Sequence, residues 1–203
     1  MTTQISQELI DATISFHGHW CPGLAIGIRV AEWALQEMGR ATDEEIVALV
    51  ETDMCGVDAI QYLTGCTFGK GNLIHLDYGK NAFSFYRRRD RKARRLVTKH
   101  DALGHRRTEL TKLQTKMKQH GLSSEETSSW KQIREDMSKR IMSLPLEDLF
   151  IVKEPTDPAP AKARILSSLI CEACGEAVME SRSRRFQEKT LCIPCFKAQE
   201  SRN

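Results

Sequence analysis

No apolar run in the 203-residue sequence reaches the ~18 residues that a membrane-spanning helix needs, so we expect no membrane span. The first residues, Met1-Thr2-Thr3-Gln4, lack the basic and then apolar layout of a secretory signal. The sequence also lacks an internal repeat and an even number of cysteines, since it has seven. Metal-bound and free thiols in a reducing cytoplasm explain these cysteines better than a disulfide framework does.

Aromatic residues are scarce at 6%, and the net charge of +3 conceals a strong segregation of charge. Residues 1–85 carry a net charge of −7, whereas residues 86–120 carry +10. This segregation can steer an anionic partner, or it can pair basic and acidic faces in a homodimer. The basic segment 87–118 has too few aromatics for a stacking platform, so nucleic acid ranks last among the expected partners.

Hydrophobic periodicity and turn residues predict a mixed α+β domain followed by a small module. The predicted helices are Gln4–Ile14, Leu24–Met38, Val57–Leu63, Arg106–Gln119 and Ser123–Met142, and the predicted strands are Ile46–Val50, Asn72–Asp77, Ala82–Tyr86 and Arg94–Thr98. Segment 144–152 is expected to close the core, and a proline-rich stretch follows it. We therefore predict a core domain at 1–153, a linker at 154–166 and a four-cysteine domain at 167–203.

The C-terminal module contains two Cys-x-x-Cys pairs, Cys171/Cys174 and Cys192/Cys195, separated by seventeen residues. This spacing is typical of a zinc site, and four thiolates form a closed tetrahedral shell of the structural kind. So short a module needs the metal to fold. The helix-compatible segment 196–201 favours a treble-clef-like finger. Iron is an alternative ion for four thiolates, whereas two independent dithiol motifs would need a βαβ context that this tail lacks.

Segment 16–23, Phe-His-Gly-His-Trp-Cys-Pro-Gly, carries two imidazoles and a thiol in alternation. Pro22 favours an extended Cys21 and suits the first position of a helix. If the extension reaches back to His17, the alternation points His17, His19 and Cys21 to one side. Such a group can bind a soft or borderline metal, or do redox or acid–base chemistry. The alternative is a tight turn whose polar side chains cap the helix.

Further candidates follow along the chain. Cys55 comes after a predicted strand and can complete a metal site with the three earlier donors. The loop 64–72 is rich in glycine and contains a lysine, but it lacks the Walker spacing, so we expect it to bring Cys66 and Lys70 toward the site. Tyr78 ends a predicted strand and can serve as an acid or base, or belong to an ordinary turn.

Four ordered motifs lie at residues 16–23, 51–61, 63–73 and 77–83. Together they resemble the FmdE family, proteins similar to the FmdE component of molybdenum formylmethanofuran dehydrogenase, over about residues 8–152. The resemblance implies a thioredoxin-related core with a mixed sheet flanked by helices, often dimeric, with a C-terminal zinc finger in some members. It also implies one cleft lined by His17, His19, Cys21, Cys55, Asp58, Cys66, Lys70 and Tyr78.

Three functional hypotheses follow. The first is a metal-binding protein, accessory or regulatory to molybdenum formylmethanofuran dehydrogenase metabolism, with structural zinc, a core metal such as zinc or nickel, and the dehydrogenase subunits as partners. The second is a cytosolic metal- or thiol-dependent enzyme of unknown substrate. Its catalytic candidates are Cys21, Asp58, Cys66, Lys70 and Tyr78. The third is weak nucleic-acid binding.

Overall fold

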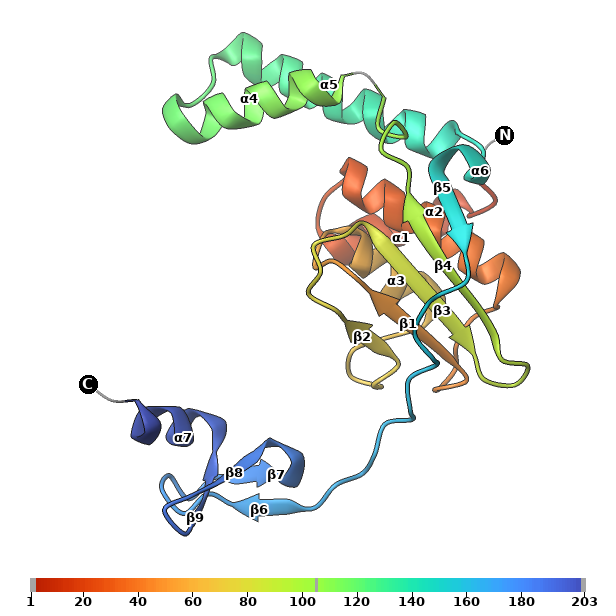
Figure 1. Ribbon diagram of the computed structural model, residues 1–203. Helices are drawn as coiled ribbons and strands as arrows, with labels where there is room; N and C mark the ends of the chain where they lie inside the picture. The colour runs from red at the N-terminus through yellow and green to blue at the C-terminus, as the bar shows by residue number, and fades with distance from the viewer. Residues whose placement is uncertain (1–2, 105, 202–203) are drawn as a thin grey trace. The chain divides into compact units, whose positions relative to one another are not determined.

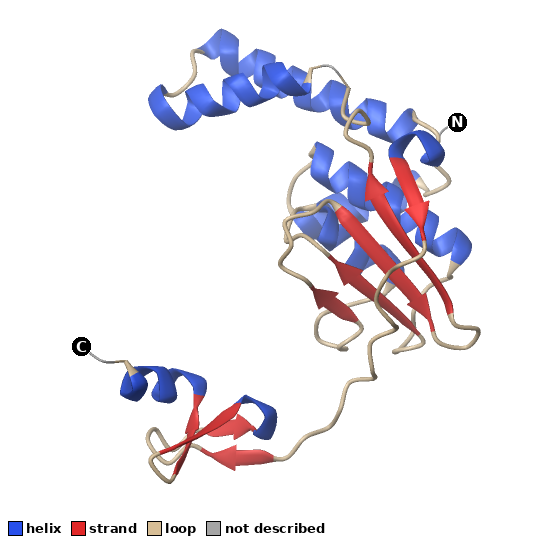
Figure 2. Ribbon diagram, viewed as in Figure 1, coloured by secondary structure: helices blue, strands red, loops and turns tan. Residues whose placement is uncertain are grey.

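The computed structural model describes residues 3–104 and 106–201, and it divides the chain into two compact units, Met1–Lys162 and Ala163–Asn203. The first unit is built on a five-stranded sheet with the strand order β2-β1-β3-β4-β5 (Figure 1). Figure 2 shows the sheet backed by helices, and this arrangement confirms the predicted α+β class with a mixed sheet.

Strand pairing in this sheet is parallel at one edge and antiparallel elsewhere. β1 (Ile46–Val50) runs parallel to β2 (Leu73–His75) and antiparallel to β3 (Ala82–Arg87). β4 (Lys92–Thr98) lies antiparallel between β3 and β5 (Phe150–Lys153). Since β1 and β2 are parallel, their carboxyl ends lie at the same edge of the sheet.

α2 (Pro22–Glu37) and α3 (Gly56–Thr64) lie over one face of the sheet (Figure 1), and α1 (Gln7–His17) packs on these two helices. The sequence of α2 is apolar on nearly every side, which is typical of a deeply buried helix. In the structure Leu24, Ala25 and Ile28 have no exposed surface, because α2 packs against the sheet, α3 and the C-terminal part of α5.

Two glycines bring α2 and α3 into backbone contact. A Cβ atom added to Gly27 would lie 2.2 Å from the carbonyl oxygen of Gly56 and 2.4 Å from its Cα. Ordinary carbon contacts are about 3.5–4.0 Å, so no side chain fits at residue 27 unless the helices separate. This close approach fixes the start of α3 beside the start of α2.

The helical pair that was predicted between β4 and β5 is present as α4 (Arg107–His120) and α5 (Ser124–Ser143). A capping box between Ser123 and Glu126 begins α5, as its sequence indicated. α4 buries no residue, whereas α5 buries Ile133 and Ile141 before the short α6 (Leu146–Leu149). Within the described residues, no helix is long and apolar enough to cross a bilayer.

The proline-rich segment that follows β5 lies against the open face of the sheet. The hydroxyl of Tyr86 donates to the carbonyl of Asp157 over 3.1 Å, and Arg88 donates to the carbonyl of Pro160 over 2.8 Å. These bonds attach residues 154–160 to the first unit, and the boundary between the two units falls after Lys162.

The second unit consists of two hairpins and a helix. β6 (Ser168–Ile170) pairs with β7 (Ala177–Met179), and β8 (Ser183–Phe186) pairs with β9 (Lys189–Cys192). A 3₁₀ turn (Glu180–Arg182) lies between the hairpins, and α7 (Ile193–Glu200) follows β9. Its buried centre is small, with Cys171, Leu191 and Cys192.

Candidate metal centres

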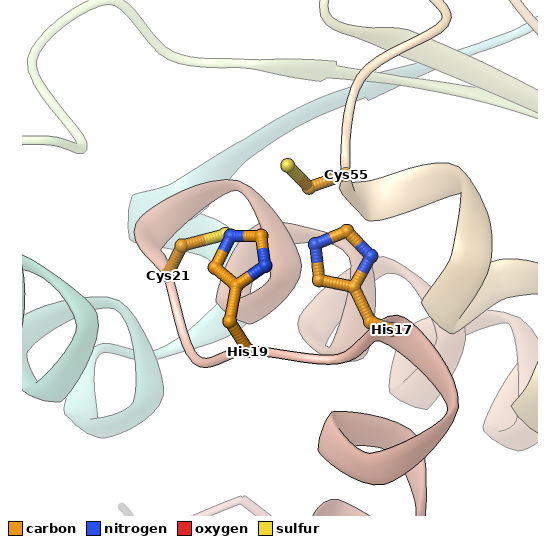
Figure 3. Close-up of side chains that lie close together, drawn as sticks. All are labelled: His17, His19, Cys21 and Cys55. Carbon is orange, nitrogen blue, oxygen red and sulfur yellow. The ribbon is translucent and has the colours of Figure 1, made fainter.

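Four side chains from separate parts of the first unit meet at one point (Figure 3). They are His17, His19, Cys21 and Cys55, and their potential ligand atoms all lie within 4.8 Å of one another. His17 is the last residue of α1, Cys21 is the N-cap of α2, and Cys55 is the N-cap of α3. His19 lies on the short connection between α1 and α2.

Local backbone geometry explains how the first three donors converge. α1 ends at His17 because Gly18 is left-handed, with φ of +92°. The extended backbone therefore does not reach back to His17, so the condition for a simple alternation of the three side chains is not met. Cys21 is extended, and its sulfur accepts a hydrogen bond from the amide of Leu24 over 3.4 Å. The segment caps α2, as the alternative interpretation had it, and it still presents all three donors to one site.

Cys55 is brought to the same point by the packing of α3 on α2. A Cβ atom added to Gly23 would lie 3.2 Å from the Cβ of Cys55 and 3.9 Å from the sulfur of Cys21. Gly56, the residue after Cys55, touches Gly27 one turn further along α2. The glycines of α2 therefore set the distance between the two thiols, although the two cysteines belong to different sequence motifs.

Asp58 orients the most buried imidazole of the cluster. Nδ1 of His17 lies 2.7 Å from a carboxylate oxygen of Asp58, and the side chain of His17 is only 10% exposed. Its other ring nitrogen, Nε2, is buried without a hydrogen-bond partner among the described residues. A carboxylate on one nitrogen and an unpaired lone pair on the other is the usual state of a metal-binding histidine. The residues present therefore fit a metal ion.

The pKa values of His19 and Cys55 also bear on whether the cluster can bind a metal ion. Desolvation lowers the pKa of His19, and coulombic interactions with His17 and Arg134 act in the same direction. Burial raises the pKa of the Cys55 thiol, and the neighbouring Cys21 adds to this, although helix N-termini favour thiolates. A neutral imidazole is ready to bind a cation, whereas the crowded thiols need a cation to hold them both as thiolates.

The donor set limits the choice of metal. Two imidazole nitrogens and two sulfurs suit borderline and soft ions such as zinc, nickel or cobalt, and they suit magnesium or calcium poorly. If all four donors bind, the shell is closed. If the exposed His19 leaves, one position opens to water or to substrate.

Three of the predicted site residues lie elsewhere. Cys66 is fully buried, its sulfur is 3.6 Å from the carbonyl of Ile46, and burial raises its pKa. Lys70 lies near the carbonyl of Thr42 and lines a separate pocket, and Tyr78 lines a third. The expectation of one common cleft is therefore wrong for Cys66, Lys70 and Tyr78.

For Cys66 and Lys70, the reason for this difference lies in β1, whereas Tyr78 follows β2 and lines a pocket with Tyr86 and Arg95. The loop 65–72 is held at the amino end of β1, where the side-chain amide of Asn72 donates to the carbonyls of Asp43 and Ile46. The metal-ligand cluster lies beyond the carboxyl end, and a five-residue strand separates the two ends by about 13 Å. Motifs on both sides of one strand are close in sequence but distant in space.

Two residues beside the cluster were not singled out from the sequence. Asp53 follows β1, His75 ends β2, and both line a pocket together with His17, Cys55 and Asp58. The available signal was the rule that polar residues after the carboxyl ends of parallel strands share one edge of a sheet. This rule could not be applied from the sequence, because the sequence did not show that β1 and β2 are parallel neighbours.

The second cluster is in the C-terminal unit and consists of Cys171, Cys174, Cys192 and Cys195, whose sulfurs lie within 4.8 Å of one another. The amide of Cys192 donates to the sulfur of Cys171 over 3.3 Å. Amide hydrogen bonds lower the pKa of Cys171 to about 6, whereas the adjacent sulfurs raise the pKa of Cys195 to about 12. Four thiolates at this separation need a cation between them, and the arrangement is that of a C4 zinc finger.

Comparison with known proteins matches both units. A family model described as "FmdE, Molybdenum formylmethanofuran dehydrogenase operon" matches residues 16–151, and one described as "Prokaryotic dksA/traR C4-type zinc finger" matches residues 164–201. The crystal structure of a "tungsten formylmethanofuran dehydrogenase subunit e (fmde)-like protein" from Syntrophus aciditrophicus is similar to this chain, with 25% sequence identity and a TM-score of 0.62. The match covers 100% of this chain and 98% of that one.

A curated relative from Archaeoglobus fulgidus, named "Probable S-adenosyl-L-methionine-binding protein", is 33% identical over 192 residues. The match covers 89% of this chain and 50% of the relative, so the chain spans about half of the relative's length. The FmdE match includes all four residues of the core cluster and more than half of the chain. The protein therefore belongs to the FmdE family, and it carries a C4-type zinc finger after the family's core domain.

Proposed function

We propose that this FmdE-family protein holds two metal ions per chain, a structural zinc in the finger and a transition metal such as zinc or nickel in the core. The observation that carries the core site is His17, whose Nδ1 is held by Asp58 while its buried Nε2 has no partner among the described residues. One potential ligand atom of each of the four residues lies within 4.8 Å of the other three.

Elemental analysis of the purified full chain tests this proposal. We expect two metal ions per chain, and one after His17→Ala or Cys55→Ser. Cys66→Ser is the matched control, because this thiol is buried away from the cluster, and it should leave the stoichiometry at two. A single zinc per chain that is lost wholly on removal of residues 167–203 would refute the core site.

We further propose that the protein is accessory or regulatory to formylmethanofuran dehydrogenase metabolism, acts as a homodimer and resides in the cytoplasm. The family description and the Syntrophus structure support the link to the dehydrogenase. Reduced thiols at both metal sites favour a reducing compartment. Co-elution of this chain with dehydrogenase subunits, and sedimentation at several concentrations, test the two partner proposals.

A second candidate is a metal- or thiol-dependent enzyme, and the exposure of His19 favours it. Were His19 to leave the metal, the open position would be of the catalytic kind. Lys70 does not line the pocket that contains His17 and Cys55, so it is not placed to stabilise a negative charge that develops beside the metal. If Cys21 and Cys55 both alkylate at the rate of ordinary thiols and no core metal is found, this candidate fails.

The name of the Archaeoglobus relative adds S-adenosyl-L-methionine as a small molecule to test, and calorimetric titration of the metal-loaded chain suffices. Nucleic acid remains the last of the proposed ligands. Several side chains of the hairpin formed by β3 and β4 already have acidic partners, including Arg87 with Asp90 and Lys92 with Glu37. Any nucleic-acid binding should therefore be weak and lost at moderate salt.

A further inference from the structure

A pocket of about 450 Å³ opens beside the core cluster, where the carboxyl ends of β1 and β2 meet the start of α3. Two of the four candidate metal ligands, His17 and Cys55, form part of its wall. The unpartnered Nε2 belongs to His17, whose side chain is nine-tenths buried. A small molecule in this pocket would therefore lie directly against the metal, and we call it the metal-side pocket.

The charge of the metal-side pocket has one sign. Asp53 and Asp58 both line it, and none of its described lining residues is a lysine or an arginine. Asp58 is engaged by His17, but Asp53 is exposed and forms no ion pair with any residue that the structure describes. The thiolates of Cys21 and Cys55 would balance the charge of a divalent ion at the core site. A cationic group can therefore satisfy Asp53, whereas an anionic group meets two carboxylates and no basic side chain.

The mouth of the metal-side pocket is apolar. Among its lining residues Phe68 is 77% exposed and Met54 is 51% exposed, while Val50 and Leu73 are buried. Large apolar side chains at a pocket mouth favour a ligand with a ring or another apolar part. The exposed His75 stands on the same wall and offers a further polar contact.

We propose that the metal-side pocket binds a small organic amine or other organic cation that also carries a ring and a donor atom for the metal. The proposal rests on the proposed core metal site and names the class of molecule that this site receives. The ring lies against Phe68 and Met54, the positive group meets Asp53, and the donor reaches the ion between His17 and Cys55.

Two probes with the same donor ring and opposite charge test the proposal. Histamine carries an ammonium group on an imidazole, and imidazole-4-acetate carries a carboxylate on the same ring. Each is titrated into the cobalt-loaded full chain while the visible absorption of the core cobalt is followed. Subtracting the spectrum of a His17→Ala/Cys55→Ser variant removes the contribution of the finger.

We expect histamine to change the cobalt spectrum at a lower concentration than imidazole-4-acetate does. Asp53→Asn should weaken histamine binding about twofold to fivefold, which is the range for an exposed ion pair, and leave the metal content unchanged. Asp53→Lys should reverse the preference between the probes. Asp43→Asn, an exposed acid at the other end of β1, is the matched control and should change neither affinity.

The outcomes separate this proposal from the one on which it rests. If core cobalt is present but the two probes bind equally, or if Asp53→Asn leaves the preference intact, the ligand class is wrong and the metal site stands. If the wild type and the His17→Ala/Cys55→Ser variant give identical cobalt spectra, no core metal is bound and both proposals fall.

Discussion

Gly27→Ala should disable the core site without altering any metal ligand. The added Cβ would lie 2.2 Å from the carbonyl oxygen of Gly56, inside the van der Waals contact. Relief requires α3 to move away from α2 by about 1 Å, because both atoms in conflict belong to backbone and neither can rotate away. Cys55 precedes Gly56 and would move with it, whereas Cys21 stays at the start of α2.

Two magnitudes follow from this displacement. Forcing an extra methyl group into a packed interface costs about 1–3 kcal/mol of folding stability. Metal–ligand bonds tolerate about 0.2 Å of error, so a shift of about 1 Å removes Cys55 from the coordination shell. We therefore expect the midpoint of chemical denaturation to fall and the metal content to drop from two ions toward one.

Chemical denaturation followed by circular dichroism and elemental analysis of the same preparations measure both effects. Gly69→Ala is the matched control, since a Cβ atom at this exposed position meets nothing within 4 Å. The reasoning is refuted if Gly27→Ala denatures at the wild-type midpoint and retains both ions. Loss of stability with both ions retained would show that Cys55 is not held in place by this helix contact.

Three further predictions concern single interactions. Asp58→Asn should lower the affinity of the core metal about tenfold by loosening His17, as competition with a chromophoric chelator would show, while Asp53→Asn changes that affinity far less. Glu51→Gln should cost about 2 kcal/mol at pH 7, because Arg95 loses a partner at 2.5 Å. The hydrogen bond from Arg95 holds the pKa of Glu51 below 4.5. The stability that this ion pair confers is therefore fully present above pH 4.5 and is lost as the pH falls through the lowered pKa. The denaturation midpoints of wild type and Glu51→Gln should then converge in acid. Chelation of zinc should unfold the C-terminal unit alone, so that its amide resonances collapse while those of the sheet persist.

Local sequence signals predicted the elements well. The strand Ile46–Val50 has the predicted bounds, and the hairpin formed by β3 and β4 lies within two residues of its predicted ends. Periodicity and capping residues act over a few positions and are visible in the sequence. The parallel pairing of β1 with β2 depends on contacts between distant segments, so no local pattern showed it.

The core site was predictable only in part. His17, His19 and Cys21 are neighbours in sequence, and their grouping followed from a short motif. Cys55 was predicted as a fourth donor from its place after a predicted strand, but the contact of Gly27 with Gly56 that positions it could not be read from the sequence. The same limit explains why Cys66, Lys70 and Tyr78 were assigned to the cluster although they lie in other parts of the fold.

The cluster in the core sits where the end of one helix meets the beginnings of two others. An ion bound there would act as a reversible cross-link that closes the loop from Cys21 to Cys55, as a disulfide does in secreted proteins. Unlike a disulfide, this cross-link forms only when the metal is available to the protein. The rigidity of the helical layer would then rise and fall with metal availability.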